Sequence, residues 1–380
     1  MPDVVKVVLN NDTLIDISDS TVEADKVLQN YVGYEGDGDR FTGAYIPASS
    51  IIPSSAAFSS NGIYSAPTGY AFDPVTVNVS GGGGDDTANS IINRTISGAY
   101  TNNNVTEIGS YAFAVCRSLT YANFPSCITI GTEAFSNCRS LTSVSFPVCT
   151  YIMSNAFAYC SSLSSVNFSS CTTIGSSAFY RCPSLTFASF PVCTSIMSSA
   201  FAYCSSLVSV NFPSCKSIGD NAFIDCSSLT SAIFPSCKSI GSNAFQFCSS
   251  LTSVSFPVCT YIGTQAFSNC RSLTSVSFPV CSYIATRAFA CCSLLASARF
   301  SVCSYIGVSA FYSCLALESV YLLNSVVCSI ASNTFAKTPI VDSSYLGYFG
   351  SVFVPTSLVD SYKSATNWAT ISDRIASYIE

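Results

Sequence analysis

The sequence predicts an α/β solenoid, in which the strands of a stacked parallel β-sheet alternate with short helical or 3-10 turns, preceded by small β-rich modules. Three observations predict this fold. An Ala-Phe pair recurs every 22 residues, the two halves of the repeat have different hydrophobic periods, and cysteines return at fixed places in the repeat. Self-similarity with a period of about 20–50 residues is typical of solenoids.

The repeat runs through more than half of the chain. Ten copies follow one another without an insertion, and an eleventh comes after a step of 24 residues. The phenylalanines of their Ala-Phe pairs are Phe113, Phe135, Phe157, Phe179, Phe201, Phe223, Phe245, Phe267, Phe289, Phe311 and Phe335. One such unit cannot bury its own apolar face, so we expect stacked copies to share one continuous core.

Each repeat has a strand half and a turn half. In one copy, Val254 and Phe256 alternate with serines, which is the period of two expected of a strand with one buried face. Further along, Ile262, Ala266 and Cys270 are four residues apart, which predicts a turn or two of α- or 3-10 helix. A proline follows the strand phenylalanine in most copies, and it ends the strand because it has no N–H to donate.

The unit I-G-x-x-A-F-x-x-C-x-S-L-x-S-V-x-F-P-x-C-x-x resembles the BspA-like leucine-rich repeat of bacterial surface proteins. The resemblance covers residues 105–335 and implies a right-handed superhelix with a parallel sheet on one face. The sequence departs from the family at the second cysteine, as at Cys259 and Cys281, where leucine is more common. This departure changes the chemistry of the core and leaves the fold unaffected.

Two short modules are expected before the repeats, at residues 1–45 and 46–86. The first contains two strands about a turn at Asn10, a short helix that begins with a capping box at Ser20, and a Gly/Asp turn that leads to a strand. Residues 21–45 and 59–79 resemble two modules of tail-associated proteins from phages of gut Firmicutes. The second module ends in a flexible linker, GGGGDD.

The ends of the solenoid are expected to carry caps, because an open end would expose the apolar core. Residues 87–104 are assigned to an N-terminal cap, residues 105–335 to the repeats and residues 336–380 to a C-terminal cap. The C-terminal segment predicts a strand, a proline and a helix with Leu358, Tyr362, Ala365 and Trp368 on its apolar side.

The composition excludes several classes of protein. Only 9% of the residues are charged, compared with about a quarter in an average protein, so serine, threonine, asparagine and tyrosine must form the surface. The net charge of −6 argues against a nucleic-acid partner. No stretch reaches 18 unbroken apolar residues, so no membrane span is expected, and no signal peptide is visible.

The chain contains 21 cysteines, nearly all of them in two columns of the repeat. Equivalent side chains of stacked turns lie about 4.8 Å apart, whereas the Cβ atoms of a disulfide lie about 3.8 Å apart. We therefore expect buried, reduced thiols, consistent with synthesis in a bacterial cytoplasm. Disulfides and metal binding are the alternatives, and the metal is disfavoured because the chain has no histidine and no C-x-x-C pair.

The sequence predicts that the protein is not an enzyme and has no cofactor or metal. Without histidine it cannot form a Ser-His-Asp or Cys-His arrangement. Glu35, Asp37 and Asp39 could supply oxygen ligands to Ca²⁺, but their spacing fits a hairpin turn better than a calcium loop. The glycine-rich linker lacks the Lys and Ser/Thr of a phosphate loop.

One surface column varies while its neighbours stay nearly constant. Two residues after the repeat phenylalanine the chain carries Val115, Asn137, Tyr159, Arg181, Tyr203, Asp225, Phe247, Asn269, Cys291 and Ser313. Exposed tyrosine and arginine on a rigid, serine-rich surface are typical of binding loops, although neutral drift of exposed positions is the alternative. The candidate ligand-binding residues are Tyr159, Tyr180, Arg181, Tyr203 and Phe247. A second column, Tyr151, Tyr261, Tyr283 and Tyr305, is a further contributor, whereas the serines of the sheet face form a poorer specificity surface.

These observations predict a recognition or adhesion protein. The leading hypothesis is a phage or prophage tail-associated protein whose N-terminal modules attach to a larger assembly and whose repeats bind a bacterial surface glycan or protein. The alternatives are a BspA-like adhesin on a bacterial cell surface, with a bacterial or host partner, and a passive spacer. The expected location is accordingly the virion, or the cell surface and extracellular space. The ligand, the host and the oligomeric state do not follow from the sequence.

Overall fold

The computed structural model describes residues 6–9, 12–16, 33–34, 40–41 and 94–378. The helix expected after Ser20 and the whole of the second module, with its glycine-rich linker, lie outside these residues. The chain divides into two compact units, which are residues 1–59 with 67–70, and residues 60–66 with 71–380.

In the first unit, the described residues form two antiparallel pairs of strands. Strand β1 (Lys6–Leu9) pairs with β2 (Asp12–Asp16). Strand β3 (Gly33–Tyr34) pairs with β4 (Arg40–Phe41).

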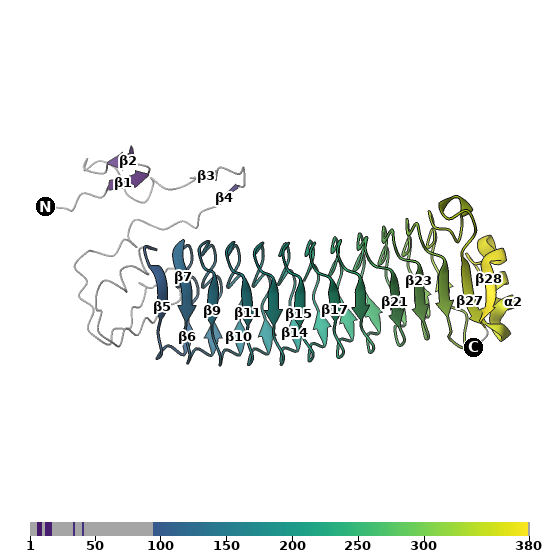
Figure 1. Ribbon diagram of the computed structural model, residues 1–380, viewed down its shortest axis with the longest axis horizontal. Coiled ribbons are helices and arrows are strands. Elements are labelled where there is room, and N and C mark those ends of the chain that lie inside the picture. Colours follow the sequence, from purple (N-terminus) through teal and green to yellow (C-terminus); the bar gives the residue numbers. More distant parts are fainter. Residues whose placement is uncertain (1–5, 10–11, 17–32, 35–39, 42–93, 379–380) are drawn as a thin grey trace. The chain divides into compact units, whose positions relative to one another are not determined.

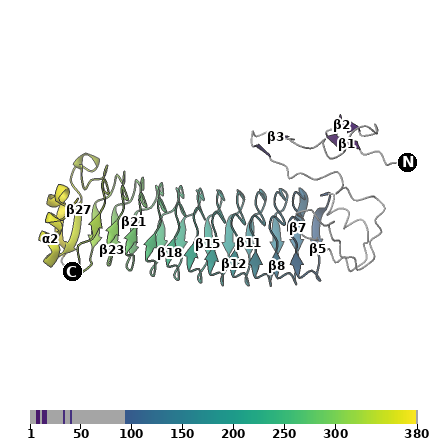
Figure 2. The ribbon, with the colours of Figure 1, turned by 180° about the vertical axis from the view of Figure 1, so that it is seen from behind.

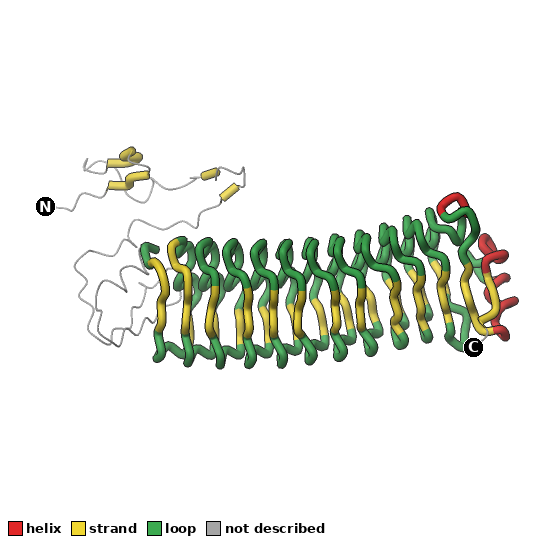
Figure 3. Tube along the Cα trace, viewed as in Figure 1, coloured by secondary structure: helices red, strands yellow, loops and turns green. Residues whose placement is uncertain are grey.

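The second unit is a parallel β-solenoid of about 13 turns with few helices, so the predicted solenoid is confirmed. Each repeat contributes one longer strand with an odd number and one two-residue strand with an even number, and successive repeats stack along one axis (Figure 1). Loops connect the two kinds of strand in every turn, as the tube in Figure 3 shows.

The two-residue strands form one parallel sheet of 11 strands, ordered from β26 to β6. The sequence predicted one strand per repeat, so this second ladder was missed. Its signal is a pair such as Tyr261 and Ile262, in which the first side chain is exposed and the second is buried. The strands are β6 (Glu107–Ile108), β8 (Thr129–Ile130), β10 (Tyr151–Ile152), β12 (Thr173–Ile174), β14 (Ser195–Ile196), β16 (Ser217–Ile218), β18 (Ser239–Ile240), β20 (Tyr261–Ile262), β22 (Tyr283–Ile284), β24 (Tyr305–Ile306) and β26 (Ser329–Ile330).

The longer strands form four parallel groups that follow one another along the solenoid (Figure 2). The first group is β5 (Ser97–Thr101), β7 (Ser118–Asn123) and β9 (Ser143–Ser145), and the second is β11 (Ser165–Asn167), β13 (Phe187–Ser189) and β15 (Ser209–Asn211). A pair follows, β17 (Ser231–Ile233) and β19 (Ser253–Ser255). The last group is β21 (Ser275–Phe278), β23 (Ser297–Phe300), β25 (Ser319–Leu322), β27 (Ser351–Pro355) and β28 (Ile375–Tyr378).

The turn half of the repeat differs from the helical turn that its spacing predicted. Across the described repeats, residues 105–335 contain tight turns and no helix. The N–H groups of Phe201 and Tyr203 donate to carbonyls of the next repeat, at 2.8 Å each, while the N–H of Ala202 between them closes a turn onto Ser199 at 3.0 Å. Because every second N–H leaves its own turn, the i to i−4 bonding of an α-helix cannot form.

The core is built from two interleaved columns of phenylalanine. Phe201 stacks on Phe223 of the next repeat with ring centroids 5.3 Å apart and planes 3° apart. The strand phenylalanine Phe212 meets Phe201 edge-on, at 5.8 Å and 71°. Offset stacking and edge contacts are the two favourable arrangements of aromatic rings, so each ring meets its neighbours in a favourable geometry.

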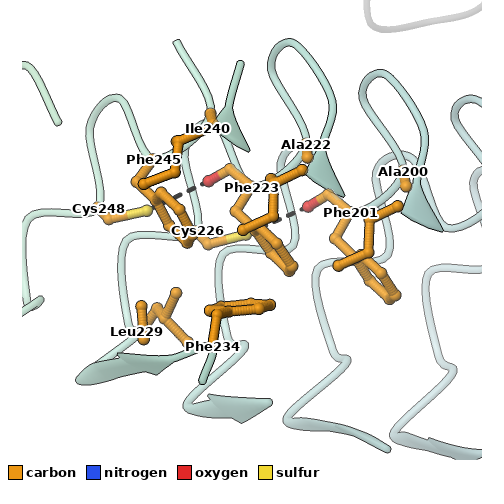
Figure 4. Close-up of a cluster of buried hydrophobic side chains, with 14 of the residues drawn as sticks. Ala200, Phe201, Ala222, Phe223, Cys226, Leu229, Phe234, Ile240, Phe245 and Cys248 are labelled. Carbon is orange, nitrogen blue, oxygen red and sulfur yellow. Dashed lines mark hydrogen bonds between the residues drawn. The ribbon is translucent and has the colours of Figure 1, made fainter. Parts of the chain in front are cut away.

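The cysteines of the two columns are buried free thiols that donate to backbone carbonyls. Cys226 Sγ lies 3.2 Å from the carbonyl oxygen of Phe201 in the preceding repeat, and Cys248 does the same to Phe223 (Figure 4). In the second column, Cys237 Sγ donates to the carbonyl of Ser239, at 3.2 Å. A leucine could not make these bonds, which gives a physical reason for cysteine at the position where the family resemblance favours leucine.

The C-terminal segment covers the last repeat. After β27 come η3 (Thr356–Leu358), α2 (Val359–Ser364) and η4 (Ala369–Arg374), and η2 (Ser343–Tyr345) precedes them. Trp368 Nε1 donates to the carbonyl of Cys328 at 2.7 Å, and Asn367 Nδ2 donates to that of Ile330 at 2.7 Å. In the preceding repeats the equivalent carbonyls of Ser304 and Ile306 accept N–H groups of the next strand. These side chains therefore replace a missing strand at the edge of the sheet.

Candidate recognition site

The variable column, Val115 to Ser313 in steps of 22 residues, lies at the outer edge of the turns. All ten residues have a positive φ between 54° and 63°, the left-handed conformation. Tyr159, Tyr203 and Phe247 are 40%, 38% and 40% exposed. Since the backbone carries the same inter-repeat hydrogen bonds at each of these positions, the side chains change without any change in the scaffold.

Four of the five predicted residues form one cluster, hereafter the Arg181 cluster, which comprises Tyr159, Tyr180, Arg181 and Tyr203. The guanidinium carbon of Arg181 lies 6.0 Å from the ring centre of Tyr159, 5.6 Å from that of Tyr180 and 5.4 Å from that of Tyr203. The rings meet edge-on, with Tyr180 5.5 Å from both Tyr159 and Tyr203. Three consecutive repeats therefore contribute to a single surface feature.

Phe247, the fifth predicted residue, is separate from this cluster. It lies two repeats beyond Tyr203 in the variable column, with Asp225 between them. Within residues 94–378, no ring contact joins Phe247 to the Arg181 cluster. The sequence could place four of the five residues on the variable column and Tyr180 on the column before it, but could not show which of them would touch.

The cluster holds a cation against aromatic faces and leaves polar groups at its rim. A guanidinium near tyrosine faces is attracted by the ring quadrupole, by about 0.5–1 kcal/mol at an exposed site. The planar guanidinium donates hydrogen bonds in its own plane, in a fork that fits carboxylates and phosphates, and tyrosine hydroxyls both donate and accept. The arrangement suits a polar ligand with hydroxyl or acidic groups.

Three tyrosines of the second tyrosine column stack on one another in the structure. The rings of Tyr261 and Tyr283 are stacked 5.5 Å apart at 14°, and those of Tyr283 and Tyr305 are 5.0 Å apart at 22°. Tyr151 lies five repeats before Tyr261, with threonine or serine between them. Because the three stacked rings cover one another's faces, this ladder offers mainly ring edges and hydroxyls to solvent.

A second arginine–aromatic cluster was missed by the sequence reasoning. Arg299, Tyr321, Phe353 and Tyr378, hereafter the sheet cluster, lie on neighbouring strands of the last parallel group. Because most residues of the sheet face are serines, the sequence predicted a poor specificity surface there. Two of the four residues also come after the repeats, where the 22-residue period gives no guidance. The available signal was the replacement of the usual Ser or Asn by Arg299 and Tyr321 at one strand position.

The described residues show no arrangement that fits metal or thiolate chemistry. No group of three or more histidine, cysteine, aspartate or glutamate side chains within them could hold a metal ion. Burial raises the pKa of the Cys127 thiol to about 11 and that of Cys160 to about 12. Thiols of this kind stay protonated at neutral pH and are poor nucleophiles. Glu35, Asp37 and Asp39 lie outside the described residues.

None of the described helices is long and apolar enough to cross a membrane. The longest of them is the six-residue α2 or η4, at the C-terminal end of the solenoid.

Stacked short repeats, two parallel ladders and a phenylalanine core define a leucine-rich-repeat solenoid. The chain belongs to the family described as BspA type leucine rich repeat region, which matches residues 93–208, 172–293 and 238–347. This confirms the resemblance seen in the repeat. The resemblance of residues 21–45 and 59–79 to phage modules stays a prediction.

Several solved structures are similar to this chain. A leucine-rich repeat protein from Bacteroides ovatus is 24% identical over 63% of this chain and 84% of that chain, with a TM-score of 0.31. A T. pallidum leucine rich repeat protein is 27% identical over 46% and 77%, with a TM-score of 0.36. A leucine rich cell surface protein from Faecalibacterium prausnitzii is 24% identical over 61% and 80%, with a TM-score of 0.32. Among curated proteins, no match was found.

Proposed function

We propose that this chain is a non-enzymatic recognition protein that binds a surface glycan or protein through the Arg181 cluster. The observation that carries the proposal is the presence of large aromatic and arginine side chains at backbone positions that disfavour them. Tyr159, Arg181 and Tyr203 all have a left-handed backbone, which Asn and Asp adopt several-fold more readily than other non-glycine residues. Residues held in such a conformation are concentrated at functional sites.

A second left-handed column in the same repeats provides an internal comparison. This companion column lies two residues before the repeat phenylalanine and comprises Tyr111, Glu133, Asn155, Ser177, Ser199, Asn221, Asn243, Gln265, Arg287, Ser309 and Asn333. Asn, which this backbone favours, fills four of its eleven positions, and Ser, whose small side chain fits the mostly half-buried setting, fills three. The variable column departs from this pattern where the Arg181 cluster forms, which supports selection for a ligand over drift.

The chemistry of the cluster suits a saccharide or a polar protein surface. Rigid aromatic side chains supply contact area at low entropic cost, and tyrosine and arginine are enriched among the residues that carry binding energy. The serine-rich surface around the cluster supplies uncharged hydroxyl groups. The ligand that we favour is a glycan of a bacterial surface, with a surface protein as the alternative.

Two carriers are compatible with this role. Residues 21–45 and 59–79, by their resemblance to phage tail modules, support attachment to a virion, whereas the BspA-type repeats support a protein of the bacterial cell surface. Immunogold labelling of the producing culture separates them: label on particles supports the first, and label on cell envelopes supports the second.

The binding proposal is tested by a pull-down of the fluorescently labelled protein on gut Firmicutes cells and on their purified wall glycans. We expect the triple variant Tyr159→Ser, Arg181→Ser, Tyr203→Ser to lose attachment while its melting temperature stays within a few degrees. The matched control is Ser209→Ala, Ser231→Ala, Ser253→Ala on the sheet face, which should bind like wild type. Equal binding by the triple variant would place the ligand elsewhere, and no binding by wild type would favour a passive spacer.

A further inference from the structure

The sheet cluster lies on a face that elsewhere carries mostly small polar side chains. Strand register places Ser277, Arg299, Tyr321 and Phe353 side by side on β21, β23, β25 and β27. These strands are at the C-terminal end of the solenoid (Figure 1). In earlier repeats the same position carries Asn167, Ser189, Asn211, Ile233 and Ser255, and the large exposed side chains of β11–β19 are Ile233 and Phe187. The composition of the face changes over its last strands.

Arg299 is held between two tyrosine rings. Its guanidinium carbon lies 5.5 Å from the ring centre of Tyr321 and 5.3 Å from that of Tyr378. Arg299 Nη2 donates to Tyr378 Oη, with 3.3 Å between the two atoms. All three side chains are half-buried. Ring contacts and one hydrogen bond therefore fix the plane of the guanidinium while part of it remains open to solvent.

The aromatic rings of the sheet cluster pack against one another and leave one face of Phe353 without a ring partner among the described residues. Tyr321 stacks on Phe353 at 4.9 Å and 14°, and Tyr378 meets Tyr321 edge-on at 5.8 Å and 85°. The neighbour of Phe353 on the next strand is Ala376, whose single methyl group covers little of the far face of the ring. The cluster thus combines a fixed cation with an aromatic face that no other ring of the described residues covers.

The charge of Arg299 is not neutralised within the cluster. Among residues 94–378 its recorded partners are Tyr321 and Tyr378, and neither is a carboxylate. A guanidinium is always charged, and its planar fork pairs with a carboxylate through two parallel hydrogen bonds. The partly positive C–H groups of a sugar ring are attracted by the negative face of an aromatic ring.

We propose that the sheet cluster is a second binding site, separate from the Arg181 cluster, for a saccharide that carries a carboxylate. The carboxylate pairs with Arg299, and the pyranose ring packs on Phe353. Tyr321 and Tyr378 hold the guanidinium in the orientation that this pairing requires. An acidic peptide would satisfy Arg299 but would leave the aromatic face without a matching ring.

The test is isothermal titration calorimetry of the full chain with tetragalacturonate, its methyl ester and 3′-sialyllactose, with tetraglutamate as the peptide probe. We expect at least one carboxylated saccharide to bind, with an affinity that falls as salt rises. The methyl ester and tetraglutamate should bind at least tenfold more weakly. Failure of both carboxylated saccharides to bind, or equal binding of the ester or the peptide, would overturn the assignment.

Variants locate the site. We expect Arg299→Gln and Arg299→Lys to weaken binding at least tenfold, because lysine keeps the charge but lacks the planar fork. Tyr378→Phe, which removes only the hydroxyl that contacts Arg299, should weaken it a few-fold. The matched control is Arg271→Gln, which removes the same charge from an exposed arginine with no ring contact among the described residues.

The triple Ser variant of the Arg181 cluster should bind these probes like wild type. This result would show that the two sites bind independently, so that the proposal for one site can be rejected while the proposal for the other stands. Unchanged binding by Arg299→Gln and Tyr378→Phe together would show that the saccharide binds elsewhere.

Discussion

Phe201 and Tyr203 lie two residues apart in the same turn, but their columns follow opposite rules. The first column is phenylalanine in every repeat, and the second holds eight residue types in ten repeats. Both residues donate their N–H groups to the next repeat at 2.8 Å. The backbone is therefore equally fixed at both positions. The side chain at Phe201 is needed for the core, whereas the side chain at Tyr203 is not needed for folding.

The difference shows how this protein separates stability from recognition. Two phenylalanine columns, two thiol columns and the leucine and isoleucine positions bury a continuous core along the whole solenoid. Because each repeat contributes the same core, a surface position can change in one repeat without cost to the next. The buried columns and the variable column should therefore respond to perturbation in opposite ways, which the following experiments examine.

The largest effect is expected from alkaline pH, which acts on the core alone. Burial raises the pKa of Cys149 to about 12 and that of Cys259 to about 11, above the usual thiol value of about 8.5. Above that usual value, the unfolded chain loses protons that the folded chain keeps. Each such thiol then lowers the free energy of unfolding by about 1.4 kcal/mol per pH unit.

Many thiols act together, so stability is fully present below about pH 8.5 and should be lost cooperatively between about pH 9 and 10. Circular dichroism followed through a pH titration with reductant measures the midpoint. Lysine and tyrosine titrate at about pH 10–10.4, so a midpoint between about pH 9 and 10 identifies the thiols. A spectrum that is unchanged at pH 11 would contradict the burial of the cysteine columns.

The next largest effect is expected from a single core ring. Phe201→Ala removes a fully buried side chain that stacks on Phe179 and Phe223, and should lower the free energy of unfolding by about 3–5 kcal/mol. Urea denaturation measures the loss, and Tyr203→Ala is the matched control two residues away. Equal shifts in the two urea midpoints would show that the assignment of core and surface columns is wrong.

The core columns could be predicted from the sequence because burial leaves a strict pattern. The phenylalanine at Phe201 recurs in all eleven repeats and the cysteine at Cys204 in ten of them, so period alone identifies them. The turn half was predicted less well: the spacing of Ile262, Ala266 and Cys270 fits a helix, but the same spacing also serves a chain of turns that donate to the next repeat. Sequence periodicity shows which side chains are buried, but it does not show which carbonyl groups accept hydrogen bonds from the backbone N–H groups.

The candidate site was predictable as a column and unpredictable as a cluster. The variability of one position pointed to Tyr159, Arg181 and Tyr203, and Tyr180 was predicted from the preceding column. The structure shows that the Tyr180 ring lies between those of Tyr159 and Tyr203 and contacts both. The sheet cluster depends on the register between β25, β27 and β28, which pairs Tyr321 with Phe353, 32 residues further on, and crosses from the repeats to the cap. A 22-residue period contains no information about that pairing.

Two adjacent cysteines allow the comparison to be made within one turn. Cys291 belongs to the variable column and is half-buried, whereas Cys292 belongs to the core column and is fully buried. In the native protein at neutral pH we expect iodoacetamide to modify Cys291 and to modify Cys292 at least about a hundredfold more slowly, because labelling of a buried thiol requires local opening. Peptide mass spectrometry over a time course measures both rates.

The control for this experiment is alkylation after denaturation without reductant, which should label all 21 cysteines. Similar native rates at Cys291 and Cys292 would contradict their placement in different columns. A large unlabelled fraction after denaturation would show that the thiols are in disulfides.

The smallest effect on stability is expected from the variable column itself, and its sign is informative. Tyr203→Asn gives the left-handed position a residue that favours it, by about 0.5–1 kcal/mol according to the several-fold preference of asparagine. The substitution also removes contacts with Tyr180 and Arg181 that are each about 0.5–1 kcal/mol. The two lost contacts together outweigh the backbone gain by about 0.5–1 kcal/mol, so the melting temperature should fall only slightly while attachment to target cells is lost.

Phe247→Asn tests the backbone preference alone, because Phe247 lies outside the Arg181 cluster and has no such ring contacts to lose. Here we expect the melting temperature to stay level or to rise slightly. The reverse change in the companion column, Asn221→Tyr, should lower stability by about 0.5–1 kcal/mol and leave attachment unaffected. If Tyr203→Asn instead keeps full attachment, the tyrosine is not maintained for a ligand, and the variable column differs from its companion only through drift.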